Sequence, residues 1–283
     1  MRKRAVIQVN IAVLLFGMAG LFAKWIGLPA LLITFGRVYL SSVTLGLFML
    51  VRRQSFRVGK REGALLVLAG AVLALHWWSF LESIQLSTVA IGTITFSAFP
   101  LFVTLIEPLS LRKRPELRDI AAAVMILIGV LITVPAYSFG NRVFLGAAVG
   151  LGSALCYAVL TVVNRQLSGR IGGMATAFYE QATAAAVLLP FAVSAKIRPS
   201  VSDLALLAFL GVVTTAIAHT LFITGLKSVP ASTAGLFSSL ETVYSIVFAY
   251  LLLGEVPAVR EVIGAAIIVG TVAVSQLYPG NNQ

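Results

Sequence analysis

Ten apolar stretches, each about as long as a membrane span, dominate this sequence. Short polar segments marked by charges, proline or glycine separate them. A helix needs about 20 mostly apolar residues to cross the hydrocarbon core of a bilayer, where each backbone polar group must find its partner within the protein. The sequence therefore predicts an all-α integral membrane protein with ten transmembrane helices, which we number as spans 1 to 10, at residues 5–23, 30–51, 62–84, 89–111, 119–136, 143–163, 174–194, 203–224, 232–253 and 262–277.

The composition supports a membrane protein. Hydrophobic residues make up 59% of the 283 residues and charged residues only 11%, whereas a soluble domain carries about 25% charged residues. The net charge of +11 would suggest nucleic-acid binding in a soluble protein. In a membrane protein the placement of basic residues instead sets the orientation, so we expect a lipid bilayer and no nucleic acid among the partners.

The basic residues gather on one side of the predicted membrane. With the N-terminus inside, 15 Lys and Arg lie on the cytoplasmic side and 5 on the other, while Arg37 lies within a span. This bias predicts that both termini are cytoplasmic. The basic start and apolar run of the N-terminus resemble a secretory signal, but nine further spans follow, so we expect a retained first helix.

One segment of the first half returns in the second. The segment HWWSFLESIQLSTVAIGTITFSAFP begins at His76, and its counterpart HTLFITGLKSVPASTAGLFSSLETV begins at His219. The same shift aligns residues 35–37 with residues 178–180. Five spans are an odd number, so the second copy enters the membrane from the opposite side. We expect two inverted five-helix repeats, residues 1–138 and 139–283, with a substrate site near the midplane between them.

Polar side chains within the spans indicate where a cavity lies, because such groups normally face the protein interior or a wet cavity. They recur at helical spacing on spans 3, 6, 7, 8 and 9. On spans 3 and 6 aromatic rings share the stripe, and we expect cavity lining from His76, Ser79 and Phe80 and from Ser153 and Tyr157. On span 7, close helix packing by small residues is the competing explanation.

Spans 4 and 9 offer further candidates. Phe96 and Phe99 place rings before Pro100, which lacks a backbone donor. Pro100 therefore predicts a kink, either a gating hinge or a static bend. Glu241 lies near the midplane of span 9 and is expected to accept a substrate amine or to pair with another group.

Several bulky or charged side chains are harder to assign from the sequence. Adjacent helical residues point about 100° apart, so only one of Trp77 and Trp78 faces a cavity; we expect Trp78 to do so and Trp77 to pack. Arg37 and Glu180 occupy equivalent positions of the two repeats at different depths, which argues against a direct pair. His219 is expected to be structural.

Residue patterns typical of enzymes are absent from the sequence. It contains no CxxC, zinc-ligand spacing, P-loop or GxSxG, and only two histidines. Cys156 is the single cysteine, so no intrachain disulfide forms. We expect no catalytic residues, no metal site and no cofactor.

The chain resembles the EamA-type branch of the drug/metabolite transporter superfamily over essentially its whole length. The similarity rests on FGR at residues 35–37, the segment around Pro100, SSLETV at residues 238–243 and LLLGE at residues 251–255. The first half departs from the pattern, with SLRKR at residues 110–114, and Val243 replaces a usual proline. The resemblance implies two inverted five-helix halves in a bacterial inner membrane.

Within the superfamily the chain is most similar to YddG-type exporters of aromatic amino acids, mainly in the segment that begins at His76. That similarity implies a central cavity walled by spans 1, 3, 4, 6, 8 and 9, with Asn10 as the polar contribution of span 1. Rings at Phe96, Phe99 and Tyr157 would then stack on an aromatic substrate.

The sequence thus predicts a monomeric transporter that exports small amphiphilic metabolites, above all aromatic and other apolar amino acids, by alternating access. Two alternatives keep the fold: a cationic-drug exporter with Glu180 or Glu241 as its counter-charge, and a nucleotide-sugar or phosphorylated-sugar transporter, for which Arg37 is the only deep cation. A membrane-embedded enzyme or scaffold is the remaining alternative. Uniport and proton antiport are both open at this point.

Overall fold

The computed structural model describes residues 2–110, 117–135, 137–138, 140–167, 170–226 and 231–277. Within these ranges the chain is helical and contains no strand. The predicted ends of span 4 at residue 111 and of span 5 at residue 136 lie outside them, as do residues 112–114, Lys227 and the side chains of residues 238 and 239.

The helices follow the ten predicted spans in order. The first half comprises α1 (Arg2–Ala19) with α2 (Phe22–Trp25), α3 (Ala30–Val51), α4 (Lys60–Leu86), α5 (Val89–Phe96) with α6 (Phe99–Ser110), and α7 (Leu117–Thr133). The second half comprises α8 (Arg142–Leu167), α9 (Gly173–Ser194), α10 (Val201–Gly211) with η1 (Val212–Ile217) and α11 (Ala218–Leu226), α12 (Ala231–Leu253) and α13 (Val259–Leu277). Spans 1 and 4 are therefore interrupted helices, whereas span 8 is continuous and contains a π-helical turn.

Five helical stretches are each long and apolar enough to cross a bilayer by length and composition. They are Ala5–Trp25, Ala30–Val51, Lys60–Leu86, Arg142–Leu167 and Val201–Phe222. Shorter apolar helices lie at Val89–Val103, Ile120–Thr133 and Leu240–Leu253. Large apolar side chains cover the outward faces, as expected where lipid replaces water.

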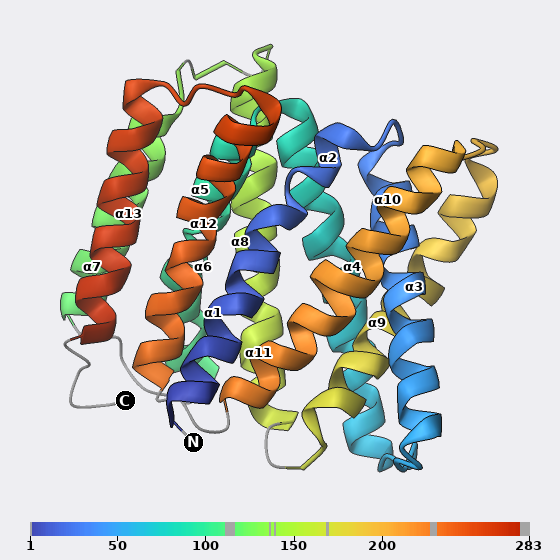
Figure 1. Cartoon of the computed structure of the whole chain (residues 1–283). Coiled ribbons are helices and arrows are strands. Elements are labelled where there is room, and N and C mark those ends of the chain that lie inside the picture. Colours follow the sequence, from blue (N-terminus) through green and yellow to red (C-terminus); the bar gives the residue numbers. More distant parts are fainter. Residues whose placement is uncertain are drawn as a thin grey trace.

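The packing of the helices follows a two-fold relation between the halves. The third span of each half packs on the first span of the other, as α4 on α8 and α11 on α1. Equivalent spans also pair, as α3 with α9, α7 with α13 and α5 with α12. Helices α1 and α8 run in opposite directions, with α7 and α13 at one edge of the bundle and α3 and α9 toward the other (Figure 1). These relations confirm the predicted fold of two inverted five-helix repeats.

Small residues let α8 approach α4 and α5 closely. The Ser83 hydroxyl on α4 donates to the carbonyl of Gly146 at 2.6 Å. A Cβ atom at Gly150 would lie 2.1 Å from Oγ1 of Thr95 on α5. The Gly146–Gly150 spacing therefore serves close packing of the two halves.

Span 4 breaks before Pro100 rather than at it. Helix α5 ends at Phe96 and α6 begins at Phe99, so Ser97 and Ala98 form the turn between them. Pro100 sits in the first turn of α6, where a helix does not need the missing N–H. The predicted bend is present, but its centre lies two to three residues earlier.

The end of the bundle at which α2 lies, at the top of Figure 1, is closed by packed apolar side chains. Phe22 of α2 and Ile26, which follows α2, are buried there with Ile33 of α3, Ile84 of α4 and Leu210 of α10. We call this region the α2 end. It seals one side of the molecule, so a cavity between the repeats cannot open through it in this state.

Polar contacts reinforce the α2 end. Gln85 accepts from the backbone N–H of Ala30 at 3.0 Å and donates to the carbonyls of Ala23 and Leu28 at 3.2 and 2.9 Å. Lys24 Nζ donates to the carbonyl of Ser87 at 2.8 Å. The connection between spans 1 and 2 is therefore tied to the end of span 3.

The second repeat contributes two carboxylates to the same end. Asp203 at the start of α10 accepts from the backbone N–H of Gly27 at 3.0 Å. Glu255, after α12, accepts from the backbone N–H of Val89 at 3.0 Å, at the first turn of α5. Both contacts join one repeat to the other, so the seal spans the interface between them.

Candidate functional site

A cavity of about 120 Å³ lies where the two repeats meet. It is bordered by α1, α3, α4, α5, α8, α9, α11 and α12. Its ring-bearing apolar and phenolic side chains are Phe16, Trp77, Phe80, Phe96, Tyr157 and Phe222, and its other polar ones are Arg37, His76, Thr161, Asn164, Glu180, His219 and Glu241. The helices at its border include spans 2 and 7 in addition to the six spans expected from the resemblance.

The cavity lies where equivalent positions of the two repeats come together. His76 and His219, which the repeat aligns with each other, both line it, and so do Arg37 and Glu180, which the same shift aligns. Positions related by an inverted repeat meet only near the axis that relates the repeats. The expectation of a site between the repeats thus coincides with an observed cavity.

Rings form one wall of the cavity. The His76 ring lies 4.9 Å from that of Tyr157 and 5.2 Å from that of Phe96, measured between centroids. Phe80 lies 5.4 Å from Phe96, and Phe99 lies 4.9 Å from Tyr157. The aromatic residues expected from the sequence therefore come together, although Phe99 stands behind the others and borders a neighbouring cavity.

His76 is fixed from outside the cavity by Ser153 of α8. The Nδ1 atom of His76 lies 2.8 Å from Oγ and 3.1 Å from the carbonyl oxygen of Ser153, and the Ser153 hydroxyl donates to the carbonyl of His76 at 2.9 Å. Ser153 is completely buried and does not border the cavity. The sequence placed Ser153 in the cavity wall; its hydroxyl is instead used to hold His76.

Arg37 is buried but only partly paired. Its Nε donates to Oγ1 of Thr215 at 2.8 Å, and its Cζ lies 3.8 Å from the centroid of the Trp77 ring. Thr215 belongs to η1, the π-helical turn of span 8, and π-turns inside helices are frequent at functional sites. A cation–π contact at this distance holds the guanidinium against the cavity wall.

Of the two adjacent tryptophans, Trp77 packs as expected, in a buried cluster with Val38 and Leu188, and it also borders the cavity, whereas Trp78, contrary to expectation, does not. Trp77 lines the cavity, while Trp78 is 36% exposed on the outward face of α4. A step of about 100° carries Trp78 away from the face that His76 and Phe80 define. Trp77 lies on the inner side, where Arg37 is placed over its ring.

Two carboxylates complete the cavity. Glu180 is 1% exposed, and its Oε1 has no hydrogen-bond partner in the described part of the chain. Across the same ranges, neither Glu180 nor Glu241 forms an ion pair with Arg37. Charged groups of both signs therefore border the cavity without neutralising one another directly, which leaves them available to a bound molecule.

Two predicted site residues are engaged elsewhere. The Ser79 hydroxyl donates to the carbonyls of Leu75 and His76 within its own helix, at 2.7 and 3.0 Å. Asn10 accepts from the Tyr244 hydroxyl at 3.0 Å. Neither borders the cavity. Sequence reasoning also missed apolar lining residues, namely Phe16, Ala19, Leu73 and Leu160, because an apolar residue in a span carries no signal of which way it faces.

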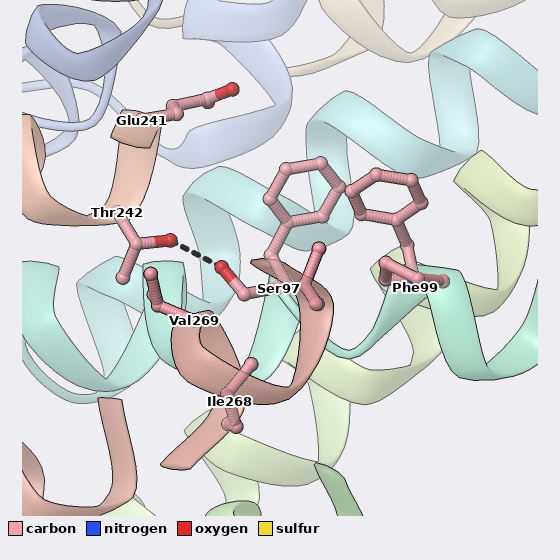
Figure 2. Close-up of a pocket in the computed structure, with 9 residues that line it drawn as sticks. Ser97, Phe99, Glu241, Thr242, Ile268 and Val269 are labelled. Carbon is pink, nitrogen blue, oxygen red and sulfur yellow. Dashed lines mark hydrogen bonds between the residues drawn. The ribbon is translucent and has the colours of Figure 1, made fainter. Parts of the chain in front are cut away.

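A second, smaller cavity of about 10 Å³ adjoins Glu241 between span 4, α12 and α13. Figure 2 shows the hydroxyls of Ser97 and Thr242 hydrogen-bonded to each other, with Val269 of α13 beside them and Glu241 pointing away from this pair. Phe99 and Pro100 border this cavity, and Glu241 borders both cavities. The break in span 4 thus lies beside the carboxylate of span 9.

The sequence profile of the EamA-like transporter family matches the chain twice, over residues 3–134 and 144–276. The chain belongs to this family. It is therefore a multi-pass membrane transporter, and the family assignment indicates transport rather than catalysis. The two matches fall on the two five-helix halves; the exact boundary between the repeats stays a prediction.

Two proteins with similar sequences are named after different transported compounds. The pseudopaline exporter CntI of Pseudomonas aeruginosa (strain UCBPP-PA14) is 27% identical over 256 residues, covering 89% of this chain and 88% of that protein. The S-adenosylmethionine uptake transporter of Rickettsia prowazekii is 26% identical over 205 residues, covering 72% and 68%. A solved crystal structure with 20% identity and a TM-score of 0.71 covers 98% of each chain and shares the fold.

Proposed function

We propose that this EamA-family transporter exports small zwitterionic amphiphiles, above all aromatic and other apolar amino acids. The observation that carries the proposal is the composition of the cavity between the repeats. One wall consists of rings, and the remainder holds one guanidinium and two carboxylates. An apolar pocket with a few placed polar groups suits a small organic solute.

The ring wall supports an apolar or aromatic side chain in the cargo. Phe80, Phe96 and Tyr157 lie at ring distances of 5.3 to 5.4 Å from one another where they pair, in edge-on arrangements. Each aromatic pair contributes about 0.5–1.5 kcal/mol beyond the burial of area. The cavity is also smaller than the roughly 300–1,000 Å³ of pockets for drug-sized ligands, which favours an amino acid over a nucleotide sugar.

The charged groups support a zwitterion. Arg37 is suited to a carboxylate, because guanidinium groups bind carboxylates through two parallel hydrogen bonds. Glu241 and Glu180 are suited to an ammonium group. A cargo with one charge of each sign finds a partner for both. Its desolvation is therefore better compensated than that of a purely anionic cargo, which would lie next to two acids.

Alternating access provides the mechanism. The α2 end is sealed, and with the termini on the cytoplasmic side as predicted, this seal faces outward. Cargo would then enter from the cytoplasm, and rocking of one repeat against the other would open the α2 end. The turn at Ser97–Ala98 and the π-turn η1 are places where spans 4 and 8 can bend. Since one chain supplies the whole cavity, we propose that the monomer is sufficient.

Flux into proteoliposomes tests the proposal. We expect saturable flux of labelled phenylalanine or tryptophan in the wild type and a loss of at least about tenfold in Tyr157→Ala, on the scale of 1.4 kcal/mol per factor of ten. Tyr250→Ala is a matched control, because Tyr250 is 55% exposed on α12. A pH gradient across the vesicle distinguishes uniport from proton antiport. Wild-type flux in Tyr157→Ala would contradict the assigned cavity.

Export of a cationic compound is the second candidate, since two carboxylates face one Arg in the cavity. Substitution of Arg37 separates the two. A zwitterion loses its carboxylate partner in Arg37→Gln, so its flux falls, whereas cation flux stays equal or rises. Arg37→Lys, which keeps the charge, is the companion variant, and a fall in cation flux that matches the fall in phenylalanine flux would contradict the assigned role of Arg37.

A further inference from the structure

The three contacts between His76 and Ser153 determine which ring nitrogen carries the proton. The Ser153 carbonyl oxygen, 3.1 Å from Nδ1, can only accept a hydrogen bond. The Ser153 hydroxyl donates its single hydrogen to the carbonyl of His76 at 2.9 Å, so it presents a lone pair to Nδ1 at 2.8 Å. Both neighbours of Nδ1 are therefore acceptors, and Nδ1 must be the donor.

The other ring nitrogen of a neutral His76 is then an acceptor. When Nδ1 carries the hydrogen, Nε2 carries a lone pair. In the described part of the chain Nε2 has no hydrogen-bond partner, and it is not among the fully enclosed polar atoms that lack one. Since His76 borders the cavity, Nε2 is the ring atom that a bound molecule can reach.

The second repeat lacks this arrangement. The shift that aligns His76 with His219 also aligns Asn10 with Ser153. Asn10 accepts from Tyr244 instead. His219 has no hydrogen bond in the described ranges and lies edge-on to Phe16, with centroids 6.5 Å apart. The contacts that fix His76 therefore have no counterpart at His219. Only one of the two equivalent histidines is held in this way.

We propose that Ser153 is a positioning residue that holds His76 as the Nδ1–H tautomer and makes Nε2 a hydrogen-bond acceptor for an N–H group of the cargo. The class of ligand is a primary or secondary ammonium, or another cationic N–H donor. A quaternary ammonium, which has no N–H, gains nothing from this nitrogen. The inference rests on the proposed function for the nature of the cargo, while the tautomer itself does not depend on it.

Nitrogen-15 NMR of protein labelled with ¹⁵N-histidine tests the tautomer directly. The chain has two histidines, so the spectrum of His219→Gln contains only the His76 signals. This variant therefore assigns them in the parent spectrum. We expect a protonated Nδ1 and an unprotonated Nε2. Ser153→Ala keeps the carbonyl of residue 153 as one acceptor but loses the hydroxyl, so it should weaken the preference and give a mixture of tautomers. Ser153→Thr should restore the single form, and Asn10→Ala should change nothing. An Nε2–H tautomer, or an imidazolium, in protein with Ser153 intact would overturn the proposal.

Flux measurements test the consequence for selectivity. Phenylalanine and its N,N,N-trimethyl derivative differ in the N–H group that Nε2 would meet. We expect Ser153→Ala to lower phenylalanine flux by the factor by which it lowers the fraction of the Nδ1–H form, about twofold for an equal mixture, and to leave flux of the trimethyl derivative unchanged. Equal losses for both would mean that Ser153 acts only on the fold and would overturn the proposal. If the protein had the Nδ1–H tautomer but transported neither compound, the proposed function would be refuted and the tautomer would stand.

Discussion

At the scale of single residues, Arg37 depends on a partner in a different repeat. Thr215 accepts from its Nε at 2.8 Å and passes its own hydrogen to the carbonyl of Leu210 at 2.7 Å. In Thr215→Val the buried Nε–H loses this acceptor, and we expect stability to fall by about 1–3 kcal/mol and substrate KM to rise. Thermal unfolding in detergent and flux kinetics measure the two effects.

Thr214→Val is the matched control for that prediction. Thr214 is also buried in η1 and donates to the same Leu210 carbonyl at 2.8 Å, but the hydrogen bond from Arg37 goes to Thr215 and not to Thr214. We expect this variant to keep the wild-type KM. Equal effects of the two substitutions on KM would show that the π-turn, rather than the bond to Arg37, is what matters.

The residues of the site were predictable where chemistry and spacing agreed. His76, Phe96 and Tyr157 could be found because a polar group and rings share one helical stripe within a span. The choice between Trp77 and Trp78 could not be made from span 3 alone, because it depends on which face of α4 packs against other spans, where Trp77 is buried with Val38 and Leu188 and Arg37 lies over its ring. Ser153 was found for the wrong reason: the stripe indicated its face, but its bonds are to His76 rather than to the cavity.

At the scale of elements, α8 can lie against α4 and α5 because Gly150 has no side chain. A Cβ there would meet Thr95 Oγ1 at 2.1 Å and Ser83 Oγ at 2.7 Å. We expect Gly150→Ala to force these helices apart and to lower stability by about 1–3 kcal/mol, the usual cost of overpacking. Thermal unfolding of the purified protein in detergent measures it.

Gly152, two residues further along the same helix, provides the comparison. A Cβ at this position would meet no atom within 4 Å, and alanine is the better helix former by about 1 kcal/mol. Gly152→Ala should therefore be neutral or stabilising. If both alanine variants lost the same stability, the cause would be helix α8 itself and not its contact with the other repeat.

Hydropathy predicts the spans well because the bilayer imposes their length, but it does not predict where they break. The turn between α5 and α6 falls at Ser97–Ala98, before Pro100, the residue that marked it in the sequence. The π-turn η1 leaves no composition signal, since Val212–Ile217 reads as an ordinary apolar helix. Its Thr215 is held by Arg37 of the other repeat, so the π-turn depends on tertiary contacts that a single span does not contain.

At the scale of the whole molecule, the inverted repeat explains why equivalent positions at the cavity carry charges of opposite sign. Equivalent positions converge near the axis, where identical charges would repel one another at short range in a medium of low dielectric. The repeats carry Arg37 and Glu180 at these positions. Duplication thus provides the frame, and divergence at the axis provides a site that can recognise both ends of a zwitterion.

The same symmetry predicts that the two ends of the bundle exchange their contacts during transport, so loosening one seal should shift the resting state. Gln85 makes three hydrogen bonds to the connection between spans 1 and 2 at the α2 end. In Gln85→Ala these backbone groups lose their partners, and we expect the population open at the α2 end to increase. Spin labels at Tyr137 and Val201, which are 60% and 85% exposed, would report it as a longer or broader distance distribution.

Gln166→Ala is the control, because Gln166 is exposed near the end of α8 remote from α2 (Figure 1). An unchanged distribution in Gln85→Ala would mean that apolar packing of Phe22, Ile33 and Leu210 alone holds the α2 end closed, and the polar contacts would then have no part in setting which face the cavity opens to.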